Sequence, residues 1–141
     1  MGREVRVVAD TNVLISALLF GGSPEQIFLA ALRGDIQLLS TLPILKELEK
    51  VLIGKFKLSA GFIKDTLDLV EEVAEIVETT SRIKVILHPD EDNRVLECAI
   101  DGRADFIVTG DTKHILPLKE FEGIRILSPS QFMKHLPSPL P

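Results

Sequence analysis

The sequence has little or nothing of what several protein classes require. Cys98 is the only cysteine among the 141 residues, which excludes an intrachain disulfide and a metal site built from cysteines. Its apolar helical surroundings, VLECAI, favour a small buried side chain. No apolar run approaches the roughly 20 residues that a membrane-spanning helix needs, and the first residues lack the layout of a signal peptide. We therefore expect a soluble, cytoplasmic protein that has no membrane partner.

Two common kinds of catalytic machinery are also missing. Gly21-Gly22 is not followed by the Lys-Ser/Thr pair of a phosphate-binding loop. No Gly-x-Ser-x-Gly motif marks a serine nucleophile. These absences exclude a nucleoside triphosphatase of the phosphate-loop type and a serine hydrolase with a nucleophile elbow.

Positive charge is in the minority. The formal net charge is −5, which argues against nucleic-acid binding by bulk electrostatics but leaves room for a local basic patch. Four lysines fall close together in the sequence, although a solvated face is the better prediction for most of them: Lys46, Lys50, Lys55 and Lys57.

Hydrophobic periodicity predicts strands that alternate with helices along the chain. This order indicates an α/β fold in three α/β/α layers, with a central, mainly parallel sheet covered on both faces. A single domain is expected over residues 1–136, with a flexible tail at 137–141. The expected strands cover 5–8, 36–39, 83–87, 106–109 and 124–127. The expected helices cover 13–19, 24–33, 42–54, 60 to beyond 77, 91–100 and a short segment from 129, with caps at Ser23, Thr41, Ser59, Asp90 and Ser128.

Two of the predicted strands are followed by an aspartate. Asp10 closes VRVVA, and Asp111 follows FIVTG. The carboxyl ends of parallel strands lie at one edge of a sheet, where α/β proteins place their ligands, so neighbouring strands would bring both side chains to one crevice. Each aspartate also has a structural explanation. Asp10 or Thr11 can cap the next helix, and Gly110-Asp111 is ordinary turn chemistry.

The helix predicted within DNRVLECAI places a further carboxylate on its apolar side. At about 100° per residue, Asp92 falls near the middle of the face that Val95, Leu96 and Ala99 define, and Glu97 points to the opposite, polar side. An aspartate in the first turn also suits the helix dipole. However, a buried carboxylate must be paired or must bind a cation, so a functional role is favoured.

The remaining acidic and imidazole side chains are less specific. Glu47 and Glu49 lie at opposite margins of one apolar helix face, and periodicity does not choose between them. Three or four carboxylates without a cysteine cluster favour a hard cation, Mg²⁺ or Mn²⁺, which can activate water for phosphodiester hydrolysis. The histidines have no ligand spacing: His88, His114 and His135. His114 lies close enough to Asp111 in the sequence to contact substrate, but a surface position is favoured.

Three segments together resemble the motifs of PIN-domain ribonucleases: DTNV at 10–13, DNRVLECA from Asp92, and VTGD at 108–111. The resemblance covers nearly the whole chain, in the family's order and size. The chain is most similar to toxin components of toxin–antitoxin systems that are related to the VapC toxins. Any one motif is weak, but the ordered set is fairly specific.

The resemblance implies a site and its partners. It assigns catalytic, metal-binding roles to Asp10, Glu47, Asp92 and Asp111, and it thereby chooses Glu47 over Glu49. It implies Mg²⁺ or Mn²⁺ as cofactor, RNA as substrate, an antitoxin protein as partner and a homodimer. The antitoxin is expected in a groove near the site, lined by the helices after Ser23 and Ser59. The supporting polar residues would be Thr11, Asn12 and Thr109, with Asp90 as a helix cap and Glu97 as an additional acid despite its polar-face position.

These observations predict a metal-dependent endoribonuclease that hydrolyses RNA phosphodiester bonds as the toxin of a toxin–antitoxin pair. The alternative is a non-catalytic metal-binding or protein-interaction module of the same fold, which the acidic composition keeps open. A phosphoacceptor receiver domain is disfavoured. Such a domain needs an acidic pair on its first strand, an aspartate on a middle strand and a late lysine. In this chain the first strand offers one acid, and no middle strand ends in an aspartate.

Overall fold

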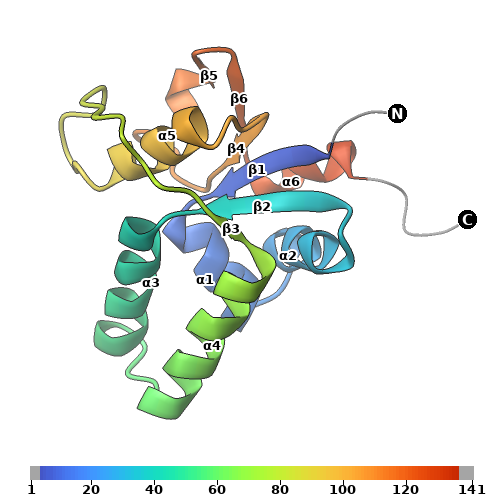
Figure 1. Ribbon diagram of the computed structural model, residues 1–141, viewed down its shortest axis with the longest axis vertical. Coiled ribbons are helices and arrows are strands. Elements are labelled where there is room, and N and C mark those ends of the chain that lie inside the picture. The colour runs from blue at the N-terminus through green and yellow to red at the C-terminus, as the bar shows by residue number, and fades with distance from the viewer. Residues whose placement is uncertain (1–3, 137–141) are drawn as a thin grey trace, which may run out of the picture.

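A six-stranded sheet forms the centre of the computed structural model, which describes residues 4–136 (Figure 1). The strand order is β3-β2-β1-β4-β6-β5, and the described neighbours pair in parallel except for β5 and β6. This arrangement confirms the predicted α/β class with a mainly parallel sheet. The strands are β1 (Val5–Ala9), β2 (Ile36–Ser40), β3 (Glu75–Ile76), β4 (Phe106–Val108), β5 (Glu120–Phe121) and β6 (Ile124–Leu127).

Helices cover both faces of the sheet. Figure 1 shows α5 on one side and α1 to α4 on the other, which gives the three layers expected from the sequence. The central strand β1 is enclosed between them, and its residues Val7, Val8 and Ala9 are fully buried. The helices are α1 (Thr11–Leu19), α2 (Ser23–Arg33), α3 (Leu42–Gly54), α4 (Ala60–Val73), α5 (Asp92–Asp101) and α6 (Pro129–Phe132), with 3₁₀ turns η1 (Leu116–Leu118) and η2 (Met133–His135).

Local signals set most helix ends correctly. Thr41 and Ser59 cap α3 and α4, and Ser128 forms the predicted capping box with Gln131. Ser23 is instead the first residue of α2, and the preceding glycine occupies the cap position. The predicted cap at Asp90 is also wrong, because its carboxylate accepts from the side chains of Asn93 and Arg94, and Glu91 occupies the cap.

The helix predicted to continue beyond Val77 ends at Val73. The chain then joins the edge of the sheet, where Leu39 lies opposite Glu75 in β3. The N–H of Val77 donates to the carbonyl of Ser40 at 2.8 Å. The apolar periodicity continues through this segment, but the backbone hydrogen bonds that the open edge of β2 offers determine its conformation.

The strand predicted at 83–87 is absent from the described sheet. This segment runs alongside α5, and side chains of that helix satisfy its backbone. Asn93 accepts from the N–H of Ile86 at 2.9 Å and donates to the carbonyl of Ile86 at 2.6 Å. The N–H of Ile83 donates to Glu97 at 3.0 Å. Glu97 is consequently only 3% exposed, which corrects its expected position on a polar face.

We expect Asn93→Ala to lower the free energy of unfolding by about 2–3 kcal/mol. Asn93 is fully buried, and its loss leaves the N–H and the carbonyl of Ile86 without their partners. Urea denaturation of this variant, compared with Gln26→Ala on the exposed side of α2, measures the effect. A loss no larger than that of the surface control contradicts this role of the amide.

Two further expectations concern the ends of the chain and membranes. Residues 137–141, the predicted tail, lie outside the described residues. Within residues 4–136, no single helix is both long and apolar enough to span a bilayer; α1 and α2 meet the length and composition criteria only as a pair, bent by 89°.

Candidate functional site

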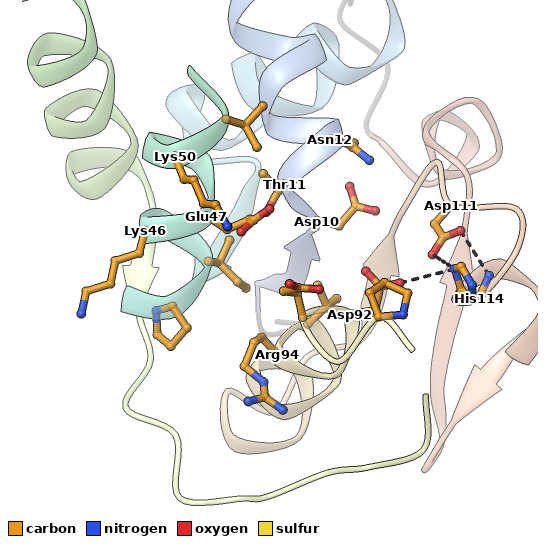
Figure 2. Close-up of a pocket in the computed structure, with 16 residues that line it drawn as sticks. Asp10, Thr11, Asn12, Lys46, Glu47, Lys50, Asp92, Arg94, Asp111 and His114 are labelled. Carbon is orange, nitrogen blue, oxygen red and sulfur yellow. Dashed lines mark hydrogen bonds and ion pairs between the residues drawn. The ribbon is translucent and has the colours of Figure 1, made fainter. Parts of the chain in front are cut away.

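A cleft of about 580 Å³ opens at the carboxyl ends of β1 and β4 (Figure 2). Its walls come from the start of α1, one side of α3, the start of α5 and the turn after β4. This position at the carboxyl edge of a parallel sheet is where α/β folds place their ligands. The lining residues are Asp10, Thr11, Asn12, Pro43, Ile44, Lys46, Glu47, Lys50, Val51, Pro89, Glu91, Asp92, Arg94, Val95, Asp111 and His114.

Asp10 lies at the floor of this cleft and is 6% exposed. One carboxylate oxygen accepts from the N–H of Val13 at 2.8 Å, so the residue caps α1. The other oxygen accepts from the hydroxyl of Thr109. Burial raises the pKa of Asp10 above its usual value, and these two hydrogen bonds oppose that increase. Asp10 therefore both caps α1 and lines the candidate site, two roles that the sequence presented as alternatives.

Thr109 connects the first and last acidic segments. It is fully buried directly after β4, donates to Asp10, and accepts from the N–H of Asp111 at 3.0 Å. Its hydroxyl thus joins the end of β1 to the turn that presents Asp111. Thr11 and Asn12, the other predicted supporting residues, line the cleft from the first turn of α1.

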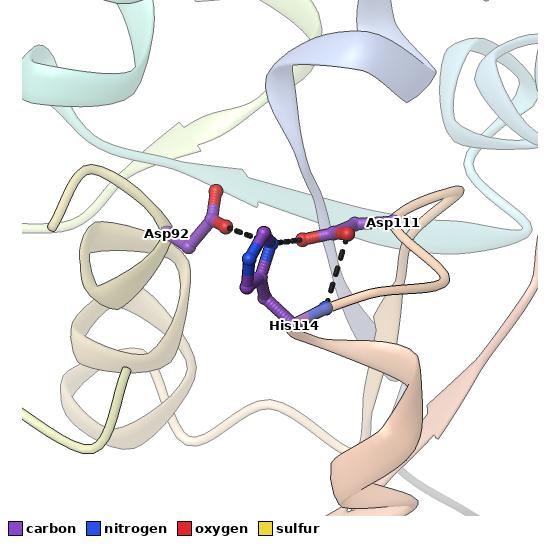
Figure 3. Close-up of side chains that lie close together, drawn as sticks. All are labelled: Asp92, Asp111 and His114. Carbon is purple, nitrogen blue, oxygen red and sulfur yellow. Dashed lines mark hydrogen bonds and ion pairs between the residues drawn. The ribbon is translucent and has the colours of Figure 1, made fainter. Parts of the chain in front are cut away.

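Asp92 and Asp111 face each other across the cleft with His114 between them (Figure 3). Nδ1 of His114 lies 3.3 Å from Oδ2 of Asp111 and 3.6 Å from Oδ2 of Asp92. The three side chains are partly accessible, with exposed fractions of 24% for Asp92, 18% for Asp111 and 38% for His114. The structure therefore brings together two of the predicted carboxylates and one histidine.

The two carboxylates have opposite electrostatic environments. Burial, followed by the proximity of Asp111, raises the pKa of Asp92 to about 7. Burial also tends to raise the pKa of Asp111, but backbone N–H groups of Lys113 and His114 donate to it and lower the pKa below its usual value. Two carboxylates this close repel each other when both are ionised. A bound cation would relieve that repulsion.

The geometry fits a divalent cation. One ligand atom from each of Asp92, Asp111 and His114 lies within 4.8 Å of the others. Adjacent ligands of an octahedral ion with bonds of about 2.1 Å are roughly 3 Å apart, close to the separations of 3.3 and 3.6 Å around Nδ1. Two carboxylate oxygens and an imidazole nitrogen are suitable donors for Mn²⁺, and the oxygens suit Mg²⁺. These residues therefore fit the cofactor that the sequence implied.

The other predicted acids occupy different places. Glu47 lines the cleft from α3, whereas Glu49 lines a separate groove between α3 and α4. Within the described part of the chain, the compact group of side chains that could hold a metal ion does not include Glu47 or Asp10. Glu97 does not line the cleft; it accepts from Ile83 and lies 3.1 Å from Nε of Arg94.

His114 is a site residue that sequence reasoning considered but ranked as a surface histidine. Its position three residues after Asp111 is the one feature of the sequence that indicates a contact between the two. In the structure, Asp111 accepts from the N–H of His114, as is typical of a turn closed by an aspartate. Such a turn folds the imidazole back towards the carboxylate. A surface position was favoured because this tertiary consequence of the turn is not visible in hydrophobic periodicity.

Three cationic side chains line the same cleft. Lys46 and Lys50 extend from α3, and Arg94 extends from α5 (Figure 2). Of the four neighbouring lysines in the sequence, Lys55 and Lys57 are not part of the lining. The cleft therefore combines an acidic centre with basic groups, although the chain as a whole is acidic.

Comparisons with known proteins agree with this arrangement. A family model described as "PIN domain" matches residues 6–113. A solved structure with a similar fold is the crystal structure of VapBC2 from Rickettsia felis bound to a DNA fragment from their promoter. The match has a TM-score of 0.60 and 17% sequence identity, and covers 86% of this chain and 97% of that chain. At this identity the structural match shows the fold. A search of curated sequences gave no significant match.

Proposed function

Because this chain belongs to the PIN-domain family, whose members are generally nucleases, we propose that it is a metal-dependent endoribonuclease. The observation that carries the proposal is the convergence of Asp92 and Asp111 in a cleft that also contains basic side chains. The acidic centre suits a divalent cation, and the basic groups suit a phosphodiester substrate. Mg²⁺ or Mn²⁺ is the proposed cofactor.

The residues of the site have different proposed roles in hydrolysis. Asp92 and Asp111 would hold the ion, which when bound activates water and neutralises charge that develops on the phosphate. Asp10 positions Thr109 by accepting a hydrogen bond from its hydroxyl, and that hydroxyl accepts from the N–H of Asp111. Glu47, on the α3 wall, completes the site directly or through water. In the reaction, water attacks the phosphorus, the bond to O3′ breaks, and a 5′-phosphate and a 3′-hydroxyl remain.

Cleavage of a panel of RNAs in Mg²⁺ or Mn²⁺ tests the proposed activity. We expect internal cuts that stop on chelation and resume when the ion is restored. The new 5′ ends should accept ligation without prior phosphorylation, because they carry a phosphate. If the protein binds the ion but cuts no RNA, the non-catalytic metal-binding module is the better description.

The basic residues of the cleft are expected to bind the RNA backbone. Replacing Lys46 and Lys50 together by glutamine should weaken RNA binding about tenfold or more. The slope of log affinity against log salt concentration should also become shallower, by the amount expected for the loss of about one to two phosphate contacts. Fluorescence anisotropy in EDTA, at several salt concentrations, measures binding without cleavage.

The matched control is the double replacement of Lys55 and Lys57 by glutamine. It removes the same charge from the same stretch of sequence but does not alter the lining of the cleft. Equal losses in the two double variants contradict a local role for the cleft lysines and indicate a general effect of net charge.

The proposal extends to a toxin role with an antitoxin partner and a homodimeric state. The groove between α3 and α4 supports it, because both apolar and charged side chains line it: Ile53, Leu58, Ala60, Ile63 and Leu67, with Glu49, Lys64, Asp68 and Glu71. Such a groove suits an amphipathic helix. This groove differs from the predicted one, which the helices after Ser23 and Ser59 were expected to form. Co-expression with the adjacent open reading frame, followed by pull-down and sedimentation analysis, tests both partners. Without an antitoxin, a role in RNA processing is favoured.

A further inference from the structure

The turn that carries His114 is fixed at several points. Oδ1 of Asp111 accepts from the N–H groups of Lys113 and His114, at 3.0 and 3.1 Å. The carbonyl of Asp111 accepts from Leu116 at 3.0 Å, and Ile115 is 1% exposed in the core. Both neighbours of the histidine in sequence are therefore held. The backbone of His114 is thus fixed beside Asp111, and from this position its imidazole reaches the carboxylate of Asp111.

The same hydrogen bonds leave the second oxygen of Asp111 directed at the imidazole. Oδ1 is occupied by the turn, and Oδ2 lies 3.3 Å from Nδ1 of His114. Oδ2 of Asp92 approaches the same nitrogen at 3.6 Å from the opposite wall. Three possible metal-ligand atoms, one each from Asp92, Asp111 and His114, thus lie close together between two walls of the cleft (Figure 3).

The chemical types of these donors distinguish between cations. Mg²⁺ strongly prefers oxygen ligands, whereas imidazole nitrogen is a good ligand for first-row transition-metal ions. We propose that His114 is a direct metal ligand through Nδ1, and that it makes this site select Mn²⁺ and related transition-metal ions over Mg²⁺. The inference rests on the proposed function only in placing a cation between Asp92 and Asp111.

An ion pair without a metal role is the competing explanation. A protonated imidazole between two carboxylates would show the same distances, and it would compete with a cation instead of binding it. The two explanations predict opposite effects of removing the ring. Loss of a ligand weakens binding of Mn²⁺, whereas loss of a competing positive charge strengthens binding of every cation.

Metal affinities of purified full-length protein, measured by calorimetry at one fixed pH, test the inference. We expect His114→Ala to weaken Mn²⁺ binding by at least about tenfold to a hundredfold, the loss that removal of even an outer-shell partner of a metal ligand causes. We expect His114→Asn, which offers an amide oxygen, to retain Mg²⁺ binding but to lose most of the preference for Mn²⁺. His88→Asn is the matched control, since His88 is exposed and does not line the cleft.

Spectroscopy supplies a readout that a purely structural role would not change. In the wild type and in His88→Asn, the electron spin echo of bound Mn²⁺ should be modulated by a coordinated ¹⁴N nucleus, and the modulation should vanish in His114→Ala. Unchanged or tighter Mn²⁺ binding in His114→Ala overturns the inference while leaving the proposed nuclease intact. If the wild type binds neither ion, the metal-dependent function fails together with it.

Discussion

Asp92→Asn is expected to lower the rate of RNA cleavage at least about a thousandfold, which corresponds to about 4 kcal/mol of lost transition-state stabilisation. The variant keeps the shape of the side chain but removes the charge on one wall of the cleft, so a cation between Asp92 and Asp111 loses one of its two carboxylates. Glu49→Gln is the matched control, because it removes a carboxylate from the neighbouring groove. Cleavage assays at saturating metal measure the difference.

The same substitution should not destabilise the metal-free protein. Burial raises the pKa of Asp92 to about 7 in the folded protein, so ionisation of this group opposes folding. The pKa of an aspartate in the unfolded chain is about 4. Between that pH and about 7 the unfolded chain loses the proton and the folded protein keeps it, so the free energy of unfolding of the wild type falls as the pH rises. In EDTA, the stability of Asp92→Asn relative to the wild type should therefore increase over that interval and then level off. Loss of both activity and stability would indicate a structural role for Asp92.

Thr109→Val is expected to lower the free energy of unfolding by about 3 kcal/mol and to reduce cleavage strongly. Valine fills the same volume but leaves one oxygen of the buried Asp10 without its donor, and the N–H of Asp111 without its acceptor. A buried charge that loses a partner is among the more destabilising defects in proteins. Urea denaturation and cleavage assays measure the two effects.

Thr109→Ser separates the hydroxyl from the methyl group. It retains both hydrogen bonds and should cost only about 1 kcal/mol, the effect of removing one buried methyl. The loss of unfolding free energy in Thr109→Val should also become smaller as the pH falls through the folded-state pKa of Asp10, which burial raises. A protonated carboxyl group is neutral, so burying it without a hydrogen-bond donor is less costly. Equal losses in the serine and valine variants contradict the proposed link.

The parts of this fold that local chemistry determines were predictable. The buried strand β1, the caps at Thr41 and Ser59, and the capping box at Ser128 follow from neighbouring residues alone, and all are present. The alternation of strands and helices predicted the α/β fold, and the shared carboxyl edge of parallel strands placed Asp10 near Asp111.

Features that depend on distant contacts were not predictable. The segment at 83–87 reads as a strand, but Asn93 and Glu97 of α5 satisfy its backbone, and no periodicity encodes that docking. Periodicity gave Glu47 and Glu49 equal claims, and only the family resemblance chose Glu47; the structure places the two side chains in different cavities. His114 required the geometry of a single turn.

The hydrogen bond between Thr109 and Asp10 joins residues 99 positions apart, and this separation bears on how the protein emerges from the ribosome. Chains are synthesised from the N-terminus, and contacts between distant residues form only after the intervening loop has closed. β1 and the helices up to α4 can be complete while β4 and the turn with Asp111 are still unmade. A nascent chain therefore lacks one wall of its own cleft until most of the sequence has been translated.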